Sequence, residues 1–88
     1  MEIKKAKSLL FDIIDICNQL EEEILSDTCH GIYNDVSASK HIDDVISSAR
    51  ELMVFVNDAP WDEMDGGEDL RNDIEIIYTQ LLEEYDEF

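Results

Sequence analysis

Two cysteines and two histidines are the residues of this sequence whose side chains could act as nucleophiles or ligate zinc. Cys29 and His30 are adjacent, but neighbouring side chains usually point in different directions and no third residue that would orient the histidine is identifiable. The spacings of Cys17, Cys29, His30 and His41 match no zinc-ligand pattern. We therefore expect no catalytic residue, no metal and no cofactor, and a protein that is not an enzyme.

An acidic segment after residue 60 has the composition of a calcium-binding loop but not its spacing. An EF-hand loop needs oxygen ligands at positions 1, 3 and 5, a glycine at position 6 and a glutamate at position 12. With Gly66 at position 6, position 1 is Trp61 and position 12 is Asn72. The sequence therefore predicts no EF-hand.

The cellular compartment is inferred from the cysteines and from the apolar segments. Cys17 falls in a helical apolar pattern and Cys29 in a loop pattern, which favours two free thiols in a reducing compartment over a Cys17–Cys29 disulfide. Asp12 and Asp15 interrupt the apolar stretch that a signal peptide would need. No stretch of 18 apolar residues is present. We expect a cytoplasmic protein with no membrane span.

The net charge restricts the class of partner. The chain has 88 residues, with 23 Asp and Glu against 6 Lys and Arg, for a net charge of −17. Because nucleic acids and anionic membranes are themselves negative, direct binding to either is excluded. Residues 43–88 carry 15 acids and 2 bases, whereas residues 1–42 carry 8 and 4. Since 44% of the residues are nevertheless hydrophobic, we expect a folded domain.

Apolar residues at helical spacing predict an all-α fold in which residues 1–88 form one domain. We expect a three-helix bundle with helices at about 3–26, 39–58 and 68–87. Residues 27–39 are rich in Gly, Asn, Asp, Ser and Thr, which favours a loop between the first two helices. The apolar residues of the first helix cover about half of its circumference, so it should contact two neighbours. One of these neighbours would be a second subunit if the protein were a homodimer.

The third predicted helix has an unusually high density of negative charge. Eight carboxylates lie between residues 68 and 87, or about one per 4 Å of helix axis, close to the 3.4 Å phosphate spacing of one DNA strand. Glu83 and Glu84 also lie near the negative end of the helix dipole, where acids are unfavourable. This placement favours a binding role for the acids, although an acidic surface also promotes solubility.

The candidate partner-binding residues are the acids of the C-terminal half and one tryptophan. Trp61 follows Pro60 in an acidic turn, where it either caps the end of the bundle or is an exposed anchor for a partner. The complete set is Asp58, Trp61, Asp62, Glu63, Asp65, Glu68, Asp69, Asp73, Glu75, Glu83 and Glu84.

In size, charge and helical character, the whole chain resembles the small acidic inhibitors that phages make against host nucleases, including anti-CRISPR and anti-restriction proteins. The resemblance includes no motif. It implies a nucleic-acid mimic that acts in the host cytoplasm and binds the basic groove of a nuclease, a CRISPR effector or another DNA- or RNA-binding protein. Two alternatives remain open from the sequence: an immunity protein or antitoxin against a nuclease toxin, and a helical dimerisation module.

Overall fold

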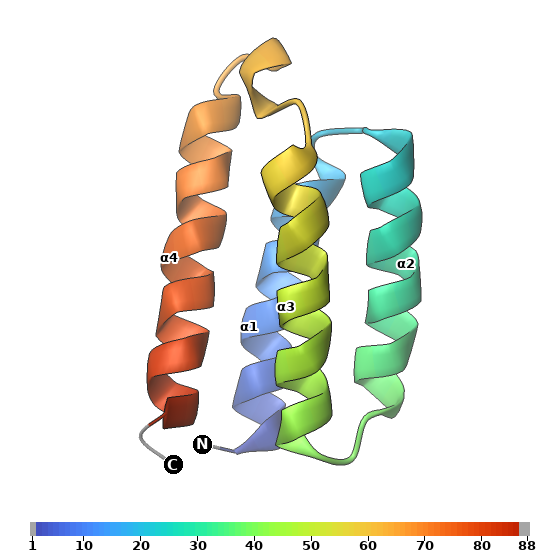
Figure 1. The fold of residues 1–88 in the computed structure, drawn as a ribbon, viewed down its shortest axis with the longest axis vertical. Helices are drawn as coiled ribbons and strands as arrows, with labels where there is room; N and C mark the ends of the chain where they lie inside the picture. Colours follow the sequence, from blue (N-terminus) through green and yellow to red (C-terminus); the bar gives the residue numbers. More distant parts are fainter. Residues whose placement is uncertain (1, 87–88) are drawn as a thin grey trace.

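The computed structural model describes residues 2–86, which form four α-helices and one short 3-10 helix (Figure 1). The described residues contain no strand, so the predicted all-α class is confirmed, whereas the predicted three-helix bundle is wrong. The elements are α1 (Ile3–Asn18), α2 (Glu23–Ala38), α3 (Ile42–Asp58), η1 (Trp61–Glu63) and α4 (Gly67–Asp86).

Consecutive helices run in opposite directions and are joined by short connections (Figure 1). α1 packs against all three other helices, whereas α2 and α4 do not contact each other. α4 packs mainly on α1 and touches α3 much less. The wide apolar arc of α1 is therefore covered by helices of its own chain. None of the four helices, as far as residues 2–86 go, has the length and apolarity needed to cross a membrane.

The predicted helix 3–26 is wrong because the chain turns after Asn18. The amides of Gln19 and Leu20 each donate to a carbonyl three residues earlier at 3.1 Å, which tightens the end of α1. Glu21 then adopts a φ of 56°, a left-handed conformation that ends the helix. Glycine would be the usual residue at such a position, and its absence here explains why the sequence pattern appeared continuous.

A side-chain cap starts α2 immediately after this turn. The Glu22 carboxylate accepts hydrogen bonds from the Ile24 amide at 3.1 Å and the Leu25 amide at 2.7 Å, which satisfies two amides that lack a helical partner. The predicted loop at 27–39 is thus also wrong, because most of it is helical. The buried side chains of α2 recur at helical spacing: Leu25, Cys29, Ile32 and Val36.

The other two predicted helices are close to those observed. α3 starts three residues later than predicted, and both ends of α4 lie within a residue of the prediction, with residue 87 outside the described part of the chain. One hydrophobic core includes side chains from α1, α2, α3, η1 and α4, and the described part of the chain buries no polar or charged residue. The described acids and bases are consequently at the surface or at its edge.

Candidate protein-binding surface

The four lysines lie at one end of the long axis of the molecule, which measures 37 Å, whereas acids lie at both ends. The beginning of α1 and the α2–α3 connection lie at one end, and the α1–α2 connection, the end of α3, η1 and the beginning of α4 lie at the other (Figure 1). The four lysines all belong to segments at the first end: Lys4, Lys5, Lys7 and Lys40. We call this the lysine end.

The opposite end, which we call the acidic end, has no Lys or Arg in residues 19–24 or 58–70. Three segments distant in sequence supply its nine carboxylates: Glu21, Glu22, Glu23, Asp58, Asp62, Glu63, Asp65, Glu68 and Asp69. Eight of these residues are exposed, and the ninth, Glu22, is the α2 cap described above. Negative charge is therefore concentrated at an end without lysine, and the base that borders it is Arg71, which lines a surface region together with Asp62 and Glu68.

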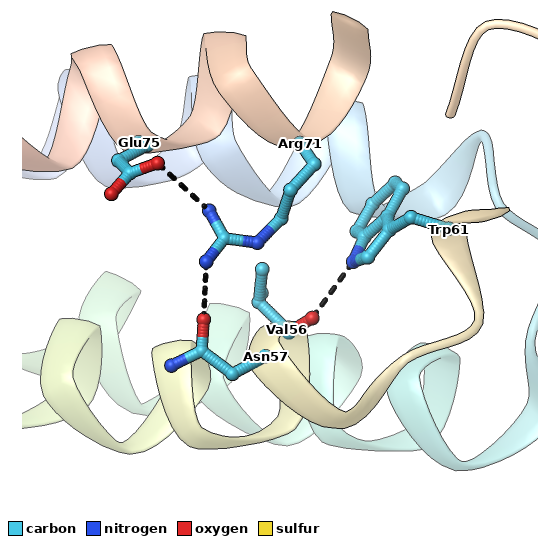
Figure 2. Close-up of polar contacts among 5 residues, drawn as sticks. All are labelled: Val56, Asn57, Trp61, Arg71 and Glu75. Carbon is cyan, nitrogen blue, oxygen red and sulfur yellow. Dashed lines mark hydrogen bonds and ion pairs between the residues drawn. The ribbon is translucent and has the colours of Figure 1, made fainter. Parts of the chain in front are cut away.

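Trp61 packs into the core at the acidic end (Figure 2). Its side chain is 5% exposed, and the indole Nε1 donates a hydrogen bond to the Val56 carbonyl oxygen at 2.7 Å. Gly67, the first residue of α4, lies so close that a Cβ there would sit 1.8 Å from the Trp61 carbonyl oxygen. Trp61 thus caps the bundle, and its interpretation as an exposed anchor is wrong for this structure.

Arg71 connects α4 to α3 beside Trp61 (Figure 2). Its guanidinium donates a hydrogen bond to the Asn57 side-chain carbonyl oxygen, and Nη1 lies 3.5 Å from Glu75 Oε2. Because the guanidinium is engaged on the α3 side of α4, it neutralises Glu75 only in part and leaves the outward acids of α4 uncompensated.

Residues 2–86 contain only one other ion pair. Lys5 Nζ lies 2.6 Å from Glu84 Oε1 at the lysine end, where α1 begins and α4 ends. Glu84 is half-buried in this contact, so it fastens α4 to α1. Nearby, the Tyr85 hydroxyl donates a hydrogen bond to the Asp43 carboxylate, which raises the pKa of Tyr85.

The structure places the sequence-predicted site residues in three groups. Six acids belong to the acidic end: Asp58, Asp62, Glu63, Asp65, Glu68 and Asp69. Three lie exposed farther along α4: Asp73, Glu75 and Glu83. Trp61 and Glu84 are engaged within the protein as described above. Nine of the eleven predicted residues are therefore exposed to a partner.

Sequence reasoning missed Glu21, Glu22 and Glu23 at the acidic end, because the predicted first helix ran through them. The 4-3-4 spacing of the apolar residues from Leu25 to Val36 was the signal that a separate helix follows. It also missed Ile76, whose side chain is 65% exposed on α4. The helical spacing of Leu70, Ile74, Ile77 and Leu81 was the signal, because it leaves Ile76 off the buried stripe.

The two cysteines are buried free thiols that face each other between α1 and α2. The hydrogen bond with Cys29 and burial together raise the pKa of the Cys17 thiol. Cys29 is 1% exposed, so the adjacent His30, which is exposed, does not make it an accessible nucleophile. Among residues 2–86, no three His, Cys, Asp or Glu side chains are grouped so that they could hold a metal ion.

Comparisons with known proteins add no relative to these observations. No protein-family model matches the chain. No curated protein and no solved structure matches it either. Any function must therefore be argued from the surface itself.

Proposed function

We propose that this protein is an inhibitor that mimics nucleic acid and binds the basic nucleic-acid-binding groove of a nuclease or other DNA- or RNA-binding protein. The observation that carries the proposal is the uneven placement of charge: nine carboxylates belong to segments at the acidic end, where no lysine lies, whereas the four lysines share the other end with acids such as Asp43 and Glu84. An anti-CRISPR or anti-restriction protein would use such a surface.

The spacing of the acids supports this proposal. Seven carboxylates lie along the 20 residues of α4, or about one per 4 Å of axis, near the phosphate spacing of a nucleic-acid strand. These acids stand on a packed helix, so a partner would spend little free energy on ordering them. Their combined field would also steer a cationic groove toward the acidic end and accelerate association.

An immunity protein or antitoxin against a nuclease toxin would need the same surface, because a nuclease active site is also basic. The difference lies in selectivity. An immunity protein binds one toxin, whereas a mimic is displaced competitively by DNA or RNA. A homodimerisation module is less consistent with the charge, since two chains of −17 each repel one another.

Displacement of a bound nucleic acid tests the proposal. Labelled DNA or guide RNA is bound to purified restriction nucleases, CRISPR effectors and colicin-type nucleases, and its fluorescence anisotropy is followed as the protein is added. We expect displacement from at least one of them, with an affinity that falls by about 100-fold or more between 50 and 200 mM salt. The proposal fails if no nucleic acid is displaced at 50 mM salt, or if the affinity is indifferent to salt.

Two variants of equal charge separate position from total charge. The first carries Asp62→Asn, Asp69→Asn and Asp73→Asn, which lie at the acidic end and on α4. The control carries three substitutions of exposed residues on α1 and α2: Asp12→Asn, Asp15→Asn and Asp35→Asn. Both have three fewer negative charges than the native −17. We expect the first to lose at least about tenfold in affinity and the control less than about threefold.

A further inference from the structure

The outward face of α4 combines an exposed apolar side chain with exposed acids. The surface is open and nearly flat, and it is lined by Asn72, Glu75, Ile76, Thr79, Gln80 and Glu83. These residues recur every three or four positions, on the side of the helix opposite the core residues Ile74 and Leu81. Since a single helix lines this surface, it suits a macromolecular partner better than a small ligand.

Ile76 is one of three aliphatic side chains of the described residues that are at least 60% exposed, with Ile24 and Val54. The side chain of Ile76 is 65% exposed, the largest exposure among the large hydrophobic residues of the described chain. A β-branched residue is also a weaker helix former than Ala, Glu or Lys. Neither packing nor helix stability therefore explains an isoleucine at this position, whereas contact with a partner would bury it.

The surroundings of Ile76 determine the charge of that partner. The exposed carboxylates of Asp73, Glu75 and Glu83 flank the neutral centre formed by Ile76 and Thr79. The only base in α4 is Arg71, which is engaged with Asn57 and Glu75 toward α3. A neutral, partly apolar centre within a charged rim is the organisation of many protein-binding sites.

We propose that the outward face of α4 docks a cationic amphipathic segment of a partner protein, with Ile76 as the apolar anchor and the flanking acids paired to Lys or Arg. A second copy of this chain is disfavoured, because it would bring the same carboxylates against each other. A nucleic acid is disfavoured for the same reason. The inference rests on the proposed function in one respect, that the partner is a cationic protein.

Two synthetic cationic peptides probe this surface on the full chain. One is a helical Lys/Leu peptide of about 18 residues, which offers charge and apolar side chains. The other is an oligoarginine of about eight residues, which offers charge without an apolar face. Backbone amide shifts of the labelled protein locate each peptide, and titrations at low salt give the affinities.

Ile76→Ala is the test substitution and Val54→Ala is its matched control. Val54 is similarly exposed, at 60%, but lies on α3 four residues after Arg50. We expect the Lys/Leu peptide to change the backbone amide shifts of residues 72–83 most. Ile76→Ala should weaken the binding of this peptide about tenfold, and Val54→Ala should weaken it less than about twofold. The affinity of the oligoarginine should fall by less than about twofold in either variant.

Ile24→Ala tests the main competing location, because Ile24 is 63% exposed and follows the glutamates of the α1–α2 connection. The inference is overturned if Ile24→Ala weakens the Lys/Leu peptide more than Ile76→Ala does. It is also overturned if neither peptide binds, or if Ile76→Ala weakens both peptides equally. If the protein displaces nucleic acid from a target and Ile76→Ala displaces it equally well, this docking site alone is overturned. If the peptide binds at α4 but the protein displaces no nucleic acid from any target, only the proposed function is overturned.

Discussion

Salt should stabilise this protein strongly, because its folded form brings like charges close together. The radius of gyration is 12.4 Å, equivalent to a sphere of about 16 Å radius, whereas an unfolded chain of this length has a radius of gyration of about 29 Å. The net charge of −17 is the same in both states. Self-repulsion is therefore greater in the folded state, and salt that screens it favours folding.

The size of the effect follows from the charge and the two radii. When ionic strength rises from 0.01 to 0.15 M, screening lowers the repulsion by about 12 kcal/mol in the folded state and about 4 kcal/mol in the unfolded state. The difference of about 8 kcal/mol is an upper limit, because counterions that gather around the folded protein reduce its effective charge. We expect the free energy of unfolding to rise by about 3–8 kcal/mol over this range.

Urea unfolding at a series of NaCl concentrations measures this change, since urea is uncharged and leaves the ionic strength unaltered. Repulsion scales with the square of the net charge, so both triple Asp→Asn variants should show a salt dependence smaller by about one-third. Their equal response would contrast with their unequal binding to a target. The reasoning would be refuted if salt raised the free energy of unfolding of the native protein by less than about 1 kcal/mol. It would also be refuted if the rise were the same in the native protein and in the two variants.

Three further predictions concern the capped end and the buried thiol. Trp61→Phe removes the hydrogen bond to the Val56 carbonyl oxygen and leaves a small void, so urea unfolding should show a loss of about 2 kcal/mol; a loss below about 0.5 kcal/mol would contradict the capping role. Gly67→Ala should lower the free energy of unfolding by about 2–3 kcal/mol, because the added Cβ would clash with the Trp61 carbonyl. Gly31→Ala in α2, where a Cβ meets nothing within 4 Å, should raise it by about 0.5–1 kcal/mol. Equal effects of the two substitutions would contradict the steric argument. The buried thiol pair keeps a proton on Cys17, because the hydrogen bond with Cys29 and burial raise the pKa of Cys17. The stability that this proton contributes is complete below the ordinary thiol pKa of 9.0 and is lost as pH rises above it. Replacing both thiols, Cys17→Ala with Cys29→Ala, should therefore make the loss of stability above about pH 9 less steep in urea titrations, and an unchanged slope would contradict this assignment.

Periodicity alone could predict the helical class, α3, α4 and most of the core. It could not predict the break after Asn18, because a left-handed glutamate ends α1 where no glycine or proline marks the position. The short polar residues of α2 pointed to a loop, although its buried stripe compensates for their weak helix propensity. Packing overrides propensity in this segment, and packing is not visible in local composition.

The candidate surface was predictable in its chemistry and less so in its shape. Composition located most of the acids, but only the fold places the α1–α2 connection, which contains Glu21–Glu23, at the same end of the molecule as η1 (Figure 1). Trp61 was ambiguous in sequence because burial depends on the close approach of Gly67 to its backbone. The helical spacing of Ile74 and Ile77 left Ile76 off the buried stripe, but the sequence did not show that its side chain is 65% exposed.

An even number of antiparallel helices returns the chain to the side from which it started. α1 begins and α4 ends at the lysine end (Figure 1), whereas a bundle of three would have released the chain beside the acidic end. A reporter protein fused to either terminus, or a tether to a sensor chip, would therefore be attached away from the acidic end and leave it unobstructed. Labels placed at the termini therefore leave the acidic end accessible, whereas a tag that follows α4 begins within about one helical turn of Glu83 on the outward face.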